Sequence, residues 1–284
     1  MQTYLILSPA YYGNIDSHAM YRISTKLQNI CKKLETKNMR LDFAAFRYNN
    51  CEKLNTHEYC MLLEFIAFCS HAKITPLLNL SSYKIEVLLL LWLHGFQIGI
   101  HFKESDMPLL RSNAGKELSL SLSMQPYSIN LRDNLEIIYN KLIHTNPNVA
   151  KIIEQLIINK IYLESFITPL QNAINIFSKT SCYANQYLMQ SIDNADKRFC
   201  IFVSTHSASD LEEMLLYGIN YATISPIFYD KGNKALGLNY LQNMPSKLKS
   251  ISFALGGIHS DLYVKQISNF GLCGFASISY FLNI

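Results

Sequence analysis

The sequence has few of the features that mark secreted or membrane proteins. Its 7 cysteines are scattered and none lies in a C-x-x-C pair, which argues against a disulfide framework or a structural zinc site. The longest uninterrupted apolar run is Val87 to Leu93, much shorter than the roughly 20 residues of a membrane-spanning helix. The first residues, MQTY, lack the charged and apolar segments of a signal peptide. We therefore expect a soluble, cytoplasmic protein with no membrane partner.

Charge is also low and dispersed. The chain has 25 basic and 21 acidic residues, a net charge of +4, and no long basic run, so it shows no electrostatic footprint for nucleic acid. A small anionic ligand is compatible with this charge. The composition is 49% hydrophobic, enough for one large core or two smaller ones, so the fold class must come from the pattern.

Short apolar runs rich in β-branched and aromatic residues alternate with segments of helical period, which predicts repeated βα units and a parallel sheet. We expect strands at Thr3–Ser8, Leu41–Arg47, Ile74–Asn79, Phe96–His101, Cys200–Ser204, Tyr221–Ser225, Ile251–Leu255 and Cys273–Ala276. Polar residues recur at the carboxyl ends of nearly all these runs. In a closed barrel those ends meet at one mouth, so the pattern favours an α/β fold of the TIM (β/α)8 barrel type.

One long segment interrupts the alternation. No glycine occurs between Lys116 and Tyr217, and apolar residues in this region recur at helical spacing. We expect residues 1–111 and 199–284 to form the barrel and 112–198 to be a helical insertion after the fourth strand. Because the chain ends at Ile284, the eighth helix should be truncated or missing, and we expect a helix of the insertion to cover strands eight and one.

A glycine pair marks the strongest local motif. Gly256-Gly257 follows a buried strand and precedes a helical segment, a pattern that lets backbone N–H groups approach a phosphate. The alternative is a plain tight turn. Phosphates in such barrels usually bind to the loops after strands seven and eight, and the eighth loop here is Ser277-Ile278-Ser279. The two loops together predict a phosphate site.

Four motifs then follow one another in a fixed order: VSTHS (203–207), GINYATISPIF (218–228), ALGGI (254–258) and GFASIS (274–279). Upstream are PLLN (76–79), GIH (99–101), DMP (106–108) and Arg111. In order and spacing this set resembles the thiamine phosphate synthase/TenI family. Residues 1–73 resemble the family only loosely and 112–198 not at all.

The resemblance implies a transferase that joins an aminopyrimidine pyrophosphate to a thiazole phosphate and releases pyrophosphate with the help of Mg²⁺. It implies catalytic roles, including pyrophosphate binding, for Arg47, Ser204, His206 and Lys234; substrate binding by Asn79, Gly256, Gly257, Ser277, Ile278 and Ser279; and a metal ligand in Asp106. A cation and a metal would stabilise the charge of the leaving pyrophosphate.

The chain departs from the family pattern at several positions. Leu80 stands where the family usually has a second metal-binding aspartate, and Ala45 and Asn49 replace a glutamine and a lysine around Arg47. The lysine of the loop after strand six could be Lys231 or Lys234.

Two other functions therefore stay open. In the TenI branch a histidine at the position of His206 acts as acid and base in thiazole tautomerisation, which suits a group that titrates near neutral pH. A non-catalytic phosphate-ligand binder or regulatory protein is the other alternative. We interpret His101 as structural, because it ends a strand with no evident acidic partner. Oligomeric state is not indicated by the sequence.

Overall fold

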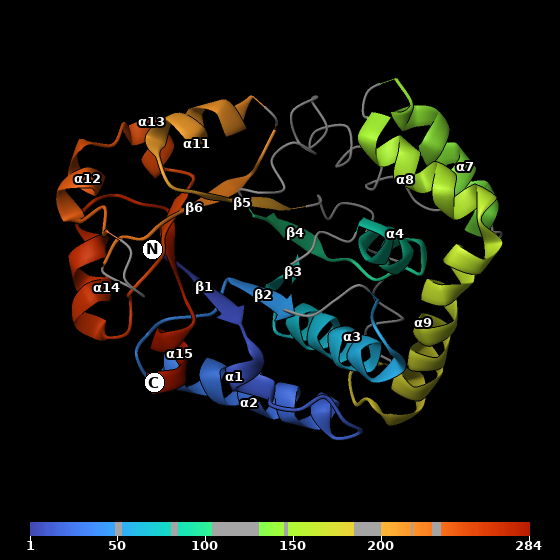
Figure 1. Cartoon of the computed structure of the whole chain (residues 1–284). Coiled ribbons are helices and arrows are strands. Elements are labelled where there is room, and N and C mark those ends of the chain that lie inside the picture. Colours follow the sequence, from blue (N-terminus) through green and yellow to red (C-terminus); the bar gives the residue numbers. More distant parts are fainter. Residues whose placement is uncertain are drawn as a thin grey trace.

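Eight parallel strands close into a single barrel in which β1 pairs with both β2 and β8 (Figure 1). This computed structural model describes residues 1–48, 53–80, 85–103, 131–144, 147–184, 200–216, 218–228 and 234–284. Its strands are β1 (Gln2–Leu7), β2 (Phe43–Tyr48), β3 (Thr75–Leu80), β4 (Gly99–Phe102), β5 (Ile201–Thr205), β6 (Tyr221–Ile224), β7 (Ser252–Ala254) and β8 (Gly274–Ser277). The TIM-barrel prediction is confirmed, and each strand overlaps the run that predicted it.

Alternation along the strands divides the core into two separate clusters. One set of side chains fills the barrel interior, namely Tyr4, Ile6, Phe43, Ala45, Leu77, Phe202, Phe253 and Ala276. Residues of the opposite set, such as Leu5, Ala44 and Phe275, belong to the larger cluster between strands and helices. Both faces of the strands are therefore buried, which explains their nearly continuous apolar runs.

Helices cover the outside of the barrel (Figure 1). Those outside the insertion are α1 (Pro9–Tyr12), α2 (Ala19–Glu35), α3 (Thr56–His71), α4 (Ile85–Leu93), α11 (Ala208–Leu215), α12 (Leu238–Asn243), α13 (Ser246–Lys249), α14 (Asp261–Ser268) and α15 (Ser279–Asn283). Helix α3 begins with a capping box, in which Asn55 and Glu58 each accept a hydrogen bond from the other's backbone N–H. Within the described residues, no helix is long and apolar enough to cross a membrane.

The described part of the predicted insertion, between β4 and β5, contains α7 (Leu131–Leu142), α8 (Pro147–Ile158) and α9 (Lys160–Thr180). Apolar residues at helical spacing in α7 and α8 are buried, as Leu135, Leu142 and Ile153 illustrate. Helix α9 continues through Pro169, which lies inside the helix. Both predicted boundaries of the insertion lie outside the described residues, and the division into domains stays a prediction.

Described helices of the insertion pack on α3 and α4. Helix α9 packs along α3, and α8 packs against α4 (Figure 1). The reason lies in the helices beneath: α3 is buried over nearly its whole length from Glu58 to Cys69, so it needs a second layer of cover on its outer side. Two buried carboxylates support this contact, because Tyr162 donates to Glu86 at 2.6 Å and Ser181 donates to Glu64.

The eighth helix is short, as expected, and it packs on strand eight and against the end of α2. The ring of Phe281 in α15 stacks on Phe275 of β8, with 5.8 Å between the ring centroids. Lys33 of α2 donates to the backbone oxygen of Ile284. The prediction that a helix of the insertion covers strands eight and one is not borne out by the described helices α7 to α9, of which α8 and α9 pack on α3 and α4, and the rest of the insertion lies outside the described residues.

Candidate active site

The interior side chains change from apolar to polar at the carboxyl ends of β2 to β6. We use the name polar arc for Arg47, Asn79, His101, Ser204 and Thr223, one residue from each of these five consecutive strands. Arg47 pairs with Asn79 in the ladder, and Ser204 pairs with Thr223. Parallel strands present their carboxyl ends at one mouth, so the polar arc lines the place where barrel active sites are built.

Three polar atoms of this arc are buried without a hydrogen bond to any described residue: Arg47 Nε, Asn79 Oδ1 and Thr223 Oγ1. A buried polar group without a partner costs about 1–3 kcal/mol, so native proteins keep few of them. Arg47 Nε is a donor, Thr223 Oγ1 can donate, and Asn79 Oδ1 is an acceptor. Such groups are suited to a polar ligand that enters the mouth and completes their hydrogen bonds.

His101 connects the interior of the barrel to its mouth. Its Nδ1 contacts the hydroxyl of Tyr4 on β1, and its Nε2 lies 3.0 Å from Ser204 Oγ on β5. Both Tyr4 and His101 are buried. Burial lowers the pKa of His101 to about 3, with further contributions from the positive charges of Arg47 and Lys103. His101 is therefore neutral at pH 7, and the charge of Arg47 acts close to it.

The glycine pair of the seventh loop is explained by close packing. Gly256 and Gly257 have φ values of +96° and +74°, which residues with a side chain rarely adopt. A Cβ on Gly257 would lie 2.7 Å from Phe228 Cβ, and a Cβ on Gly256 would lie 2.8 Å from Pro226 Cα. The turn is thus held against the sixth loop, where Phe228 donates its N–H to Gly256 O at 3.0 Å. Whether it also binds phosphate stays a prediction.

The structure brings the seventh and eighth loops together, as expected for neighbouring strands of the barrel. Ser277 Oγ donates to Ile258 O at 2.6 Å, and Ser279 Oγ donates to the same oxygen at 3.2 Å. Ile278, between them, is half-buried, and its carbonyl accepts from the hydroxyl of Tyr11. Because both serine hydroxyls already bond to Ile258, a phosphate bound here would depend on backbone N–H groups.

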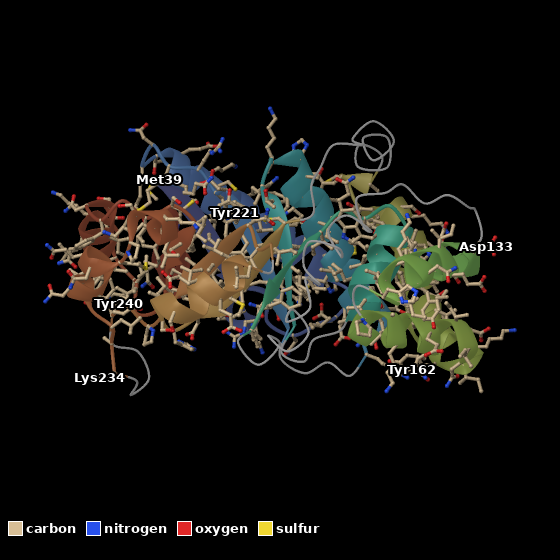
Figure 2. The ribbon with its side chains drawn as sticks, turned by 90° about the horizontal axis from the view of Figure 1, so that it is seen from above. Met39, Asp133, Tyr162, Tyr221, Lys234 and Tyr240 are labelled. Carbon is tan, nitrogen blue, oxygen red and sulfur yellow. The ribbon has the colours of Figure 1, made fainter. Side chains whose placement is uncertain are left out.

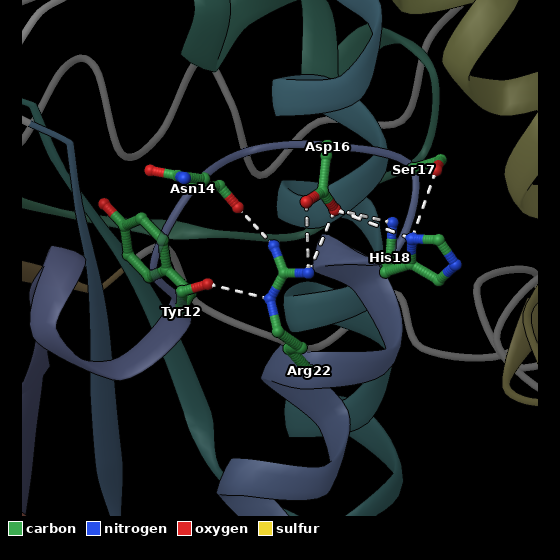
Figure 3. Close-up of polar contacts among 6 residues, drawn as sticks. All are labelled: Tyr12, Asn14, Asp16, Ser17, His18 and Arg22. Atoms are coloured by element: carbon green, nitrogen blue, oxygen red, sulfur yellow. Dashed lines mark hydrogen bonds and ion pairs between the residues drawn. The ribbon is translucent and has the colours of Figure 1, made fainter.

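The first loop is fixed across the edge of the mouth. Tyr12 at the end of α1 donates its hydroxyl to Arg47 O at 2.9 Å, which joins this loop to β2. Arg22 of α2 holds the loop from outside: its guanidinium donates to the backbone oxygens of Tyr12 and Asn14 and pairs with Asp16 (Figure 3). The loop next to Arg47 is therefore ordered by its own contacts.

The remaining predicted residues lie apart from the arc or outside the described part. His206 is exposed in the loop after β5, where its Nδ1 lies 2.7 Å from Ser225 O. Lys234 is also exposed, and Figure 2 shows it at the periphery of the molecule, away from Tyr221 in the barrel. Asp106 and Lys231 lie outside the described residues.

The described residues do not by themselves make a magnesium site. Among them, no group of three or more His, Cys, Asp or Glu side chains could hold a metal ion. Asn79 Oδ1 is a buried oxygen ligand of the hard type that magnesium prefers, but it has no described carboxylate beside it at the mouth. Asp106, the predicted Mg²⁺ ligand, lies outside the described residues.

Three members of this site were missed by sequence reasoning or assigned another role. Thr223 appeared only within a motif, Tyr4 was not considered, and His101 was interpreted as structural because no acidic partner was evident. Its partners are two hydroxyls, one of them on Tyr4, 97 residues away in the sequence. The strand alternation Tyr221-Thr223 could have indicated that Thr223 faces inward.

The comparisons with known proteins do not assign the chain to a family. No family model matches the chain, and no curated protein matches it. Among solved structures, the chain is similar to a thiamine phosphate pyrophosphorylase from Pyrococcus furiosus, with 12% identity, a TM-score of 0.48, and coverage of 100% of this chain and 88% of that one. With this TM-score, the likeness carries no conclusion about the fold or the reaction of this chain.

Proposed function

We propose that the protein is a thiamine phosphate synthase-like transferase, which joins an aminopyrimidine pyrophosphate to a thiazole phosphate and releases pyrophosphate. The observation that supports this most is the set of unpartnered buried atoms of Arg47, Asn79 and Thr223 at the mouth. The resemblance of the four ordered motifs in residues 203–279 is the second support, and it comes from the sequence alone.

Each group of the mouth has a step to perform in this reaction. The bond between the pyrimidine methylene carbon and the pyrophosphate oxygen breaks, and its electron pair leaves with the pyrophosphate. The guanidinium of Arg47 can stabilise this charge with directed hydrogen bonds, and Ser204 can donate another. The ring nitrogen of the thiazole then bonds to the carbon. Asn79 Oδ1, an acceptor, suits the amino group of the pyrimidine.

The direct test is to incubate the purified protein with both substrates and Mg²⁺ and to measure thiamine phosphate and pyrophosphate. Arg47→Ala should lower kcat/KM by about 10²–10³-fold, the usual effect of removing one stabilising donor of a developing charge. Arg40→Ala is the matched control, because Arg40 precedes the opposite end of β2 and its side chain is 83% exposed beside Asp42. Equal rates in both variants would refute the proposed role of the mouth.

A thiazole tautomerase is the second candidate, and one contact favours it. If His206 donates from Nδ1 to Ser225 O, the basic nitrogen of its neutral ring is Nε2, as proton transfer requires. A tautomerase should lose about 10²–10⁴-fold in rate with His206→Ala and change little with Asp106→Ala. A synthase should show the opposite dependence. If both assays fail while thiazole phosphate still binds, the protein is a binder.

A further inference from the structure

We propose that Tyr4 and His101 are positioning residues that fix Ser204 as a hydrogen-bond donor to an anionic ligand in the mouth, rather than as a nucleophile. The three side chains form one chain of hydrogen bonds, from Tyr4 OH through His101 Nδ1 and Nε2 to Ser204 Oγ. The inference rests on the anion-binding mouth of the proposed function and assigns the direction of this chain.

The direction follows from the surroundings of Tyr4. Its hydroxyl is fully buried among the rings of the barrel interior, with Phe202 and Phe253 at centroid distances of 4.8 and 6.0 Å. Burial raises the pKa of Tyr4, so the hydroxyl keeps its proton. His101 Nδ1 is its hydrogen-bond partner among the described residues. If Nδ1 carried a proton, the hydroxyl proton of Tyr4 would point into the apolar core with no acceptor. Tyr4 therefore donates to Nδ1.

The tautomer of His101 is then determined. A neutral imidazole has one donor and one acceptor, and Nδ1 accepts from Tyr4, so the proton of the ring is on Nε2. Nε2–H donates to Ser204 Oγ. The hydroxyl proton of Ser204 cannot be directed back to His101 and must find another acceptor. Ser204 is half-buried at the mouth, in the same polar arc as Arg47, where a phosphate oxygen is the natural acceptor.

This arrangement is the reverse of the one that activates a serine nucleophile. There, the serine donates its proton to the imidazole, which removes it during attack. Here the imidazole donates to the serine, and neither Tyr4 nor neutral His101 can remove the serine proton. The contact between Ser204 and His101 resembles part of a hydrolase site but has the opposite polarity. Ser204 binds charge and does not attack.

The tautomer can be read directly by NMR. In protein labelled with ¹⁵N-histidine, the ring nitrogens of His101 should show the Nε2–H form, assigned by comparison with His101→Gln. In Tyr4→Phe, Nδ1 has no hydrogen-bond donor, so the Nε2–H form of His101 should no longer be the only one observed. Tyr221→Phe is the matched control: its ring also lies against Phe202, at 5.0 Å, and it should leave the His101 signals unchanged. An Nδ1–H form in the wild type would overturn the proposal.

Binding of inorganic pyrophosphate, measured by calorimetry, tests the consequence at the mouth. Ser204→Ala and Tyr4→Phe should each weaken binding by about tenfold, the value of one hydrogen bond to a charged group. In the Ser204→Ala background, Tyr4→Phe should have no further effect, because Tyr4 acts through Ser204. His101→Gln, which keeps an N–H donor, should restore most of the affinity that His101→Leu loses.

Several outcomes would overturn the proposal: no pyrophosphate binding by the wild type, an additive loss in the double variant, or labelling of Ser204 by a serine-directed fluorophosphonate. Failure of the synthase assay is a separate result. The proposal stands if three results hold together: pyrophosphate binds, His101 is in the Nε2–H form, and the effects of the double variant are not additive. It then stands even when no thiamine phosphate is formed.

Discussion

The same strands carry an apolar lower half of the barrel interior, around Phe202, and a polar upper half, the polar arc at the mouth. In the lower half, Phe202 of β5 contacts the rings of Phe43, Tyr221 and Phe253 at centroid distances of 5.0–5.3 Å. Two residues further along β5 is Ser204, and two residues beyond Tyr221 is Thr223. Aromatic packing stabilises the closed barrel, whereas the polar arc keeps unpaired atoms at a cost in stability. On β5 and β6, therefore, successive inward-facing residues have different roles: the first stabilises the barrel, and the next is available to bind a ligand.

The largest effect should come from the lower half. Phe202→Ala removes the ring at the centre of the interior cluster and should lower the free energy of unfolding by about 3–5 kcal/mol, through lost burial and the cavity left behind. Denaturant unfolding followed by circular dichroism measures this change. A loss below about 1 kcal/mol would mean that the aromatic layer is not what stabilises the barrel.

The second effect concerns the boundary between the halves, at His101. Its folded pKa is about 3, whereas a histidine in an unfolded chain titrates near about 6.5. Between these pH values the unfolded chain binds more protons than the folded protein. The contribution of His101 to the free energy of unfolding is therefore fully present above about pH 6.5 and is lost as the pH drops towards about 3. The slope from this residue approaches about 1.4 kcal/mol per pH unit. Urea unfolding over this range should give a shallower slope for His101→Gln, and equal slopes would contradict the prediction.

A third variant compares the barrel with its insertion. Tyr162→Phe removes the hydroxyl that donates to buried Glu86 and should lower the free energy of unfolding by about 1–3 kcal/mol. Tyr21→Phe is the control: Tyr21 is 75% exposed, so this variant should change the free energy of unfolding by less than about 0.5 kcal/mol. If the two variants unfold alike, this hydrogen bond does not stabilise the contact of α9 with α4.

The smallest effect should have the opposite sign. Thr223→Val replaces a buried hydroxyl that has no partner among the described residues with a methyl group of similar shape, and it should raise the free energy of unfolding by about 1 kcal/mol. The same variant should weaken pyrophosphate binding if the hydroxyl serves a ligand. Thermal unfolding and calorimetry measure the two effects. A lower free energy of unfolding for Thr223→Val would show that the Thr223 hydroxyl stabilises the barrel, as the residues of the lower half do.

The fold was predictable because each strand has its own local signal. Apolar runs bounded by polar residues located all eight strands, with the largest error at Phe96, three residues before β4 begins at Gly99. The packing of the described insertion helices on α3 and α4 was not predicted, although both helices show the signal for it: apolar residues on every side of a helix require a second layer of cover. Periodicity locates elements, but their packing partners depend on the faces of other elements.

The candidate site was only partly predictable. Motifs indicated Arg47, Asn79 and Ser204; the strand register pairs Arg47 with Asn79, and Ser204 joins the arc through its contact with His101. The sequence could not indicate that His101 bonds to Tyr4, because that contact depends on barrel closure and on the direction of both side chains. Polar partners that meet across a closed barrel have no fixed sequence spacing.

The insertion has a consequence for how the chain folds. Ile100 and Ile201 are neighbours in the ladder between β4 and β5, although the whole insertion separates them, and Gln2 pairs with Gly274 at the other seam. The barrel therefore consists of two runs of four strands, each built from shorter connections and joined to the other only by long-range pairs. Closing such loops is slow because their entropy is lost before the contacts form. Each run of four strands should assemble first, and the two runs should join in the late, rate-limiting step.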